Sequence, residues 1–178
     1  MLGCGTSPWV YVLADPTSRM LSRGDPAPDF VLPGTRGEEI ADFALSRAIE
    51  TGPAVLFFYP FDFHPRCTED LCAMRDFTWI DIDPTTTVFG ISPDSVYSHR
   101  EYVRRHDIDF TLLSDPASAV ADRYGIRRTD ADDHRNVPQR AVVVADTDAT
   151  IRYTWLPAGP EDEPDPKTVV ATIEDLAT

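Results

Sequence analysis

The sequence predicts an α/β domain in which a central mixed β-sheet is flanked by helices on both faces. Three observations support this prediction. Short apolar runs of the length of a buried strand recur along the chain, segments with helix start signals alternate with them, and one strand–turn–strand pattern comes late. Alternating strands and helices are typical of a sheet covered by helices, and the late hairpin adds antiparallel strands to it.

Length and composition fit one domain. The chain has 178 residues, of which 42% are hydrophobic, enough to form a sizeable core. No stretch approaches the roughly 20 apolar residues that span a bilayer, and no basic start leads into an apolar run as in a secretory signal, so we expect a cytoplasmic protein. We expect residues 1–20 to be an N-terminal extension, disordered or upstream of the true start, and residues 21–178 to form the domain.

Apolar and β-branched runs predict the strands. The run from Pro53 to Tyr59 is continuously apolar, as in a buried central strand, and Pro60 ends it. The segment from Pro26 to Pro33 carries prolines that a sheet tolerates at an edge, so we expect it to be an edge strand. The remaining predicted strands are Thr87–Ser92, Phe110–Leu113, and a hairpin of Ala141–Asp146 with Ile151–Trp155.

Capping residues and prolines mark where the helices are expected to begin. Asp42 is placed to cap a short helix, Asp94 to cap a longer one, and Pro116 to stand in the first turn of a third. The predicted helices are residues 42–49, about 67–80, 94–106, one that starts at 114–116, and 167–176.

The charge balance is unusual. The net charge is −14, with 30 acidic residues against 16 basic ones, and the only lysine is Lys167. This composition resembles the proteins of salt-loving archaea, whose concentrated salt screens the self-repulsion of such a domain, so we expect a haloarchaeal origin. An ordinary acidic cytosolic protein is the alternative. In both cases, nucleic acids and anionic membranes are poor partners for the surface.

A close cysteine pair indicates redox or metal chemistry, because the chain has too few cysteines for the disulfide framework of a secreted protein. The cysteines are Cys4, which we take as incidental, Cys67 and Cys72. Cys67 lies in the first turn of a predicted helix, where free backbone N–H groups and the helix dipole stabilise a thiolate. We therefore expect a lowered pKa and a nucleophilic thiol. Arg66 adds positive field if it turns toward the sulfur, but Glu69 and Asp70 oppose it, so the site needs another cation.

The spacing between Cys67 and Cys72 bears on whether they can pair. In an intact helix, Cα atoms five residues apart lie roughly 8–9 Å from each other, whereas a disulfide requires about 7 Å or less. A bond between these cysteines would therefore require the first turns of the helix to unwind. This argues against a static structural disulfide and favours a cycle in which the helix opens after Cys67 is oxidised.

The segment from Pro60 to Cys72 resembles the peroxiredoxin signature, in which Pro-x-x-x-Thr-x-x-Cys leads the active-site helix. Pro60, His64 and Cys67 fall on its defined positions, and the spacing to Cys72 is similar to that of the bacterioferritin-comigratory, or Q-type, branch. Further segments similar to the family, at residues 27–30, 90–95 and 113–125, follow in the family's order.

The resemblance implies a thioredoxin-like fold and a thiol-dependent peroxidase of the AhpC/TSA family, with a role in antioxidant defence. Cys67 would be the peroxidatic cysteine, oxidised by hydrogen peroxide or an organic hydroperoxide to a sulfenic acid, and Cys72 the resolving cysteine that forms a disulfide with it. A thioredoxin-like reductant would recycle that disulfide. Pro60 would shape the pocket, and Arg140, which matches the family's arginine on a late strand, would stabilise the thiolate and polarise the peroxide. The resemblance implies no metal or organic cofactor and leaves a monomer or a homodimer open.

His64 departs from the family, which has Thr or Ser at this position with a hydroxyl that bonds both thiolate and peroxide. A neutral imidazole donates one hydrogen bond and a protonated one donates two. We expect activity to survive with a stronger pH dependence, while a loop histidine turned to solvent is an equal alternative.

Three other functions stay open. A thioredoxin-type disulfide oxidoreductase would share the fold, but it normally needs Cys-x-x-Cys, and four residues separate this pair. A zinc-binding module could use His64, Cys67 and Cys72, with a fourth ligand from elsewhere. A cysteine hydrolase would need a histidine base beside Cys67. The candidate bases are His99, His106 and His134.

Overall fold

A seven-stranded mixed sheet forms the centre of the computed structural model, which describes residues 19–76, 83–128, 134, 136–159 and 161–176. Its strands are β1 (Val31–Thr35), β2 (Ile40–Ala44), β3 (Ala54–Phe58), β4 (Thr87–Ser92), β5 (Thr111–Ser114), β8 (Ala141–Ala145) and β9 (Ile151–Trp155). They lie in the order β2-β1-β5-β4-β3-β8-β9. β3, β4 and β5 run parallel, and the other pairings are antiparallel, so the predicted mixed sheet is confirmed.

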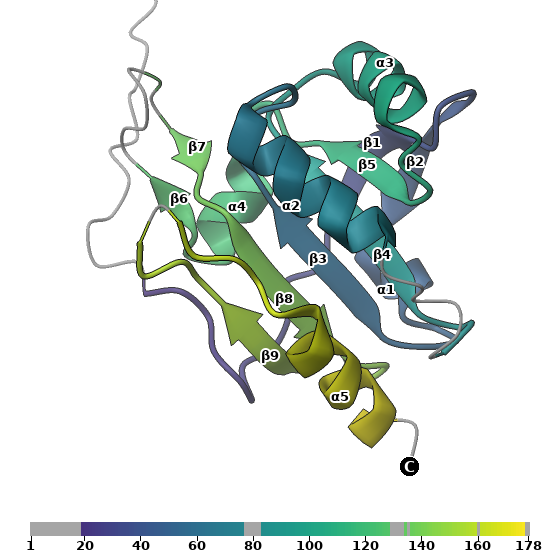
Figure 1. Ribbon diagram of the computed structural model, residues 1–178. Coiled ribbons are helices and arrows are strands. Elements are labelled where there is room, and N and C mark those ends of the chain that lie inside the picture. The colour runs from purple at the N-terminus through teal and green to yellow at the C-terminus, as the bar shows by residue number, and fades with distance from the viewer. Residues whose placement is uncertain (1–18, 77–82, 129–133, 135, 160, 177–178) are drawn as a thin grey trace, which may run out of the picture.

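Helices cover both faces of this sheet (Figure 1). Within the described residues they are α1 (Leu45–Ala48), α2 (Pro65–Asp76), α3 (Val96–His106), α4 (Ala119–Arg123) and α5 (Pro166–Leu176). Side chains alternate along β3, so Phe57 packs with α2, α3 and α5, whereas Leu56 and Phe58 pack with α1 and α4. All five residues of β3 are buried, which confirms the central strand predicted from its apolar run.

The first strand is displaced from its predicted position. β1 begins at Val31, and it lies inside the sheet between β2 and β5 rather than at the edge. Pro33, which has no N–H to donate, is opposite Asp42 of β2, and the pairing of β1 with β5 begins only at Gly34. The proline is therefore tolerated because it lies where β1 has one neighbouring strand, although the strand as a whole is not an edge.

The predicted helix at residues 42–49 is wrong in its first half. Residues 40–44 form β2, the true edge strand, and the helix is confined to Leu45–Ala48. Asp42 does not cap this helix. Asp29, 17 residues earlier in the chain, accepts a hydrogen bond from the Ser46 N–H at 2.9 Å and supplies the missing acceptor at the helix start. A cap from so far away leaves no local pattern in the sequence.

The remaining elements follow the predictions with small shifts. Ser95 rather than Asp94 caps α3, and Asp115 accepts the N–H groups at the start of α4. A two-stranded sheet of β6 (Arg127–Arg128) and β7 (Val137–Pro138) was not predicted. The predicted extension lies outside the described residues up to position 18, and residues 77–80 of the predicted active-site helix lie outside them as well. Among the described helices, none is both long and apolar enough to cross a membrane.

Candidate active site

Cys67 lies just after the loop that connects the central strand β3 to helix α2. β3 ends at Phe58, Pro60 follows it, and a short loop leads to Pro65, the first residue of α2. Pro65 suits a first helical position because its missing N–H would have no helical partner there. Cys67 is thus in the first turn of the helix, as predicted, and its side chain is fully buried.

The Cys67 sulfur faces His64. The distance between Sγ and the His64 Nδ1 atom is 3.6 Å, and the side chain of His64 is half-buried. His64 therefore points into the site and not into solvent, which removes the alternative of a solvent-facing loop histidine. At this distance a ring nitrogen can accept the thiol proton or donate one to a thiolate, depending on the protonation of the ring.

The predicted cation is near the sulfur but is shared with a carboxylate. Arg140 immediately precedes β8, and its Nη1 atom donates to the Oδ2 atom of Asp70 at 2.7 Å. Both side chains are nearly excluded from solvent, and the guanidinium lies 5.8 Å from the centre of the Trp155 ring. Asp70 stands one helical turn after Cys67, so α2 presents the sulfur and this carboxylate on the same face.

Arg66 does not turn toward the sulfur. Its guanidinium pairs with Glu69 at 3.1 Å and with Glu163 at 2.9 Å, and its Nε atom lies 3.9 Å from Asp70. It also donates to the backbone oxygen of Glu161 at 2.8 Å. Arg66 therefore joins the start of α2 to the acidic loop before α5, and it adds little positive field at Cys67.

The expected lowering of the Cys67 pKa is wrong for this state of the site. Burial raises the pKa of the thiol to about 12, and the carboxylates of Asp70 and Asp62 also raise it. A hydrogen bond with the Phe61 backbone and the charge of Arg140 lower the pKa without outweighing the burial. The groups that stabilise a thiolate are present, but burial removes water from the Cys67 sulfur. The negative charge of Asp70 also offsets the positive charge of Arg140.

Cys72 lies on the same unbroken helix. Both cysteines are free thiols, with Cys67 buried and Cys72 half-buried. Because α2 is continuous from Pro65 to Asp76, helix geometry keeps their Cα atoms roughly 8–9 Å apart. A disulfide between them therefore still requires part of α2 to unwind, as the spacing predicts.

A buried polar network behind the loop was not predicted. His99 on α3 lies 2.9 Å from Asp62 Oδ2 through its Nδ1 atom, and Asp62 also accepts from the hydroxyls of Tyr59 and Ser98. Asp62 and His99 are 37 residues apart in the chain, so no local motif joins them. Only the buried strand and the helix packed on it bring the two side chains together.

This geometry weakens one of the alternative functions, the zinc-binding module. Among the described residues, no three His, Cys, Asp or Glu side chains are grouped to hold a metal ion, so His64, Cys67 and Cys72 do not form the zinc site considered above. A cysteine hydrolase stays open, because His64 lies 3.6 Å from the Cys67 sulfur, whereas of the candidate bases His99 is held by Asp62 and the His134 ring packs 4.5 Å from the ring of Phe61.

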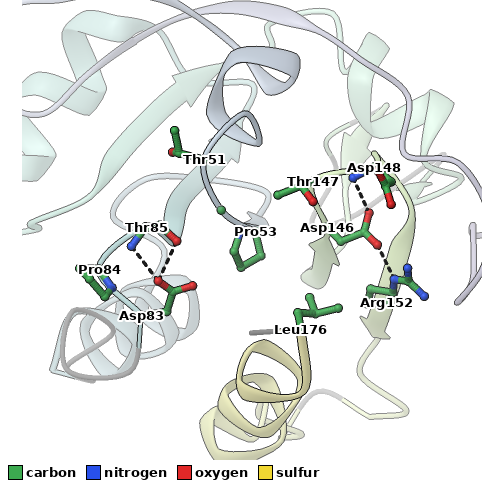
Figure 2. Close-up of a pocket in the computed structure, with 11 residues that line it drawn as sticks. Thr51, Pro53, Asp83, Pro84, Thr85, Asp146, Thr147, Asp148, Arg152 and Leu176 are labelled. Atoms are coloured by element: carbon green, nitrogen blue, oxygen red, sulfur yellow. Dashed lines mark hydrogen bonds and ion pairs between the residues drawn. The ribbon is translucent and has the colours of Figure 1, made fainter. Parts of the chain in front are cut away.

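A separate cavity of about 540 Å³ lies at the opposite end of β3, where Pro53 leads into the strand (Figure 2). Asp83 and Asp146 lie on its two sides, and the oxygens of Asp146 accept from the Asp148 and Thr150 N–H groups and pair with Arg152. The side chains of Asp83 and Asp146 are therefore already hydrogen-bonded or ion-paired within the chain, and the cavity is remote from Cys67.

Known proteins are similar to this chain in sequence over most of its length. Peroxiredoxin Q of Oryza sativa subsp. japonica chloroplasts is 33% identical over 135 residues, which are 76% of this chain but only 59% of the rice protein. The chloroplastic peroxiredoxin Q of Sedum lineare is 30% identical over 76% of this chain and 69% of its own length.

Solved structures of peroxiredoxins are also similar to this chain. Peroxidoxin BcpB from Mycobacterium tuberculosis superimposes with a TM-score of 0.75 at 29% identity, over 89% of this chain and 99% of that one, which confirms the thioredoxin-like fold. None of these comparisons tests the salt-loving origin, which stays a prediction. Residues 23–154 match the AhpC/TSA family, and the chain therefore belongs to this family, the peroxiredoxin family that its active-site segment resembles.

Proposed function

We propose that this chain is a thiol peroxidase that reduces hydrogen peroxide or organic hydroperoxides through Cys67. The observation that carries the proposal is the pairing of the Cys67 sulfur with His64 Nδ1, 3.6 Å apart, at the first turn of α2. Membership of the AhpC/TSA family supports the same activity. The names of the chloroplastic and mycobacterial relatives agree with it and with assignment to the Q-type branch.

His64 can accept the proton that the buried Cys67 thiol does not release readily to water. Because burial raises the pKa of the thiol to about 12, very little of Cys67 is a thiolate at neutral pH. We propose that neutral His64 accepts the proton from Cys67 as the sulfur attacks the nearer peroxide oxygen. The O–O bond breaks, Cys67 becomes a sulfenic acid, and the proton passes to the departing oxygen, which leaves as water or alcohol.

Arg140 supports this step through its charge. Its positive charge lowers the pKa of the Cys67 thiol, and a cation in a water-poor site stabilises negative charge on the departing oxygen far more than it would in water. Asp70 holds Arg140 in place at 2.7 Å. In this scheme Asp70 fixes the orientation of the Arg140 guanidinium. Its negative charge also weakens the positive field of Arg140 at the Cys67 sulfur. In this scheme Pro60, which follows β3 by two residues, shapes the loop that leads to Cys67.

The second step joins the two cysteines. The Cys72 thiol attacks the sulfenic acid, a disulfide forms, and water leaves. The first turns of α2 must open for this, which breaks the hydrogen bond from Tyr102 Oη to Thr68 Oγ1, 2.9 Å long. A thioredoxin-like dithiol then reduces the disulfide. The cytoplasm, where such reductants work, is the compartment that we propose.

The experiment that tests the function compares two assays on reduced protein. Peroxide consumption with a dithiol reductant should be fast for the native chain and lost in Cys67→Ser. Insulin reduction should be no faster than the uncatalysed reaction, which separates a peroxidase from a thioredoxin-type oxidoreductase. The proposal fails if Cys67→Ser consumes peroxide at the native rate.

A further inference from the structure

A fully buried histidine–carboxylate pair stands directly behind the loop that carries His64. His99 is completely excluded from solvent, and Asp62 is 8% exposed. The His99 Nδ1 atom lies 3.1 Å and 2.9 Å from the two carboxylate oxygens of Asp62, and its Nε2 atom lies 3.2 Å from the backbone oxygen of Leu113. The peroxidase chemistry proposed above uses neither side chain.

The partners of the pair define its protonation. Both ring nitrogens of His99 face oxygens: the Leu113 carbonyl only accepts, so Nε2 donates to it, and Nδ1 donates to Asp62 when that carboxylate is ionised. Asp62 accepts from the Tyr59 hydroxyl at 2.9 Å and from the Ser98 hydroxyl at 2.7 Å, as an ionised carboxylate does. These contacts fit an imidazolium bound to a carboxylate, and buried charges of this kind persist only when they are paired and hydrogen-bonded.

Asp62 ties the active-site loop to the rest of the fold. Its backbone N–H donates to Asp94 Oδ2 at 2.7 Å, and its side chain reaches β3 through Tyr59 and α3 through Ser98 and His99. The loop needs this anchoring, because the next residue, Phe63, has φ of +60°. A bulky aromatic residue rarely adopts such a conformation, which persists only where the surroundings enforce it.

The anchored loop places the groups that touch the sulfur. Phe61 precedes Asp62 and bonds Cys67 through its backbone, and His64 follows Phe63 and faces the sulfur at 3.6 Å. We propose that His99 and Asp62, an ion pair in the native chain, position this loop through their hydrogen bonds, so that the Phe61 backbone and His64 stay in contact with Cys67. The inference rests on the proposed peroxidase function, in which His99 and Asp62 are positioning residues.

The test measures the second-order rate constant for oxidation of Cys67 by hydrogen peroxide, by stopped flow. His99→Gln and Asp62→Ala should each lower it about 10- to 100-fold, since a misplacement of about 1 Å costs up to about 100-fold. Asp62→Asn should stay within about threefold of native. Its amide oxygen can accept from Tyr59 and its amide group can donate to a neutral His99 and to Ser98, so the loop stays anchored.

Val103→Ala is the matched control. Val103 is a buried residue of the same helix, outside the network, so its truncation destabilises α3 without touching Asp62. Its oxidation rate should equal that of the native chain at a similar loss of melting temperature. A spectroscopic measurement needs no destabilised variant: ¹⁵N NMR should show both ring nitrogens of His99 protonated in the native chain, and Nδ1 without its proton in Asp62→Asn.

Three results would overturn the inference: a native oxidation rate in Asp62→Ala or His99→Gln, an Asp62→Asn rate as low as that of Asp62→Ala, or a neutral His99 ring in the native chain. If Cys67→Ser keeps the native rate, the peroxidase proposal itself fails. An active native chain with unaffected His99 variants removes the positioning role alone.

Discussion

Replacing Arg140 with Met removes the partner of a buried carboxylate. Arg140 Nη1 and Asp70 Oδ2 are 2.7 Å apart, and Asp70 is 3% exposed. Among the described residues the other cation paired with Asp70 is Arg66, whose Nε atom lies 3.9 Å away and whose other nitrogens pair with Glu69 and Glu163. The variant therefore leaves a buried charge with little compensation.

The expected loss of stability follows from this geometry. Breaking a buried ion pair by removing one partner costs about 3–5 kcal/mol of the free energy of unfolding. For a chain of this size each kcal/mol lowers the melting temperature by about 2–4 °C, so the fall should be roughly 6–20 °C. Oxidation of Cys67 should slow by about 100-fold or more, since a preorganised cation is lost.

The loss should depend on pH in a defined direction. Burial raises the pKa of Asp70, whereas the hydrogen bond and charge of Arg140 lower it. Without Arg140 the pKa rises further. A carboxyl group whose folded pKa exceeds its unfolded value destabilises the fold once it ionises, and this penalty disappears as the pH falls below the folded pKa. The destabilisation of Arg140→Met at pH 7 should therefore shrink in acid.

Thermal and urea unfolding at neutral and acidic pH, together with stopped-flow oxidation, check this prediction. The matched variant is Arg140→Met with Asp70→Leu, which replaces the pair by apolar side chains and should regain most of the stability while staying slow with peroxide. The reasoning is refuted if Arg140→Met loses less than about 1 kcal/mol, if its deficit grows in acid, or if the double variant recovers the native rate.

Three further predictions concern the two cysteines and the helix that carries them. His64→Thr should flatten the pH dependence of the oxidation rate, because a threonine hydroxyl cannot serve as the proton acceptor; identical pH profiles would exclude a proton-accepting role. Iodoacetamide at pH 7 should label half-buried Cys72 at least about 10-fold faster than buried Cys67, whose thiol pKa is about 12; peptide mapping would show the reverse order if burial did not control reactivity. Tyr102→Phe removes the hydrogen bond to Thr68, which should cost about 1 kcal/mol and speed disulfide closure about fivefold; an unchanged closure rate would mean that this bond does not restrain α2.

Local patterns were sufficient wherever a strand or helix depends on its own residues. The continuous apolar runs of β3 and β8 predict strands because burial on both faces demands such residues. β2 was missed because its five residues are mostly exposed and it is held by pairing with β1. The helix start that Asp29 supplies to α1 was missed for the same reason, since its partner is remote in the chain.

In the active site, too, the features that depend on local sequence were predictable and those that depend on distant residues were not. The position of Cys67 in the first turn of α2 is a local property and was predictable. The direction of its pKa was not, because it depends on how completely the surrounding core excludes water and on Asp70 occupying Arg140. The pairing of Asp62 with His99 was also unpredictable, as it arises where α3 packs behind the loop.

Intact mass after one equivalent of hydrogen peroxide tests the central claim most directly. The native chain should lose two hydrogens as Cys67 and Cys72 join, Cys72→Ser should gain one oxygen as the sulfenic acid persists, and Cys67→Ser should remain unchanged. A native loss of two hydrogens that survives in Cys72→Ser would contradict the pairing, and oxidation of Cys67→Ser at the native rate would contradict the role of Cys67 itself.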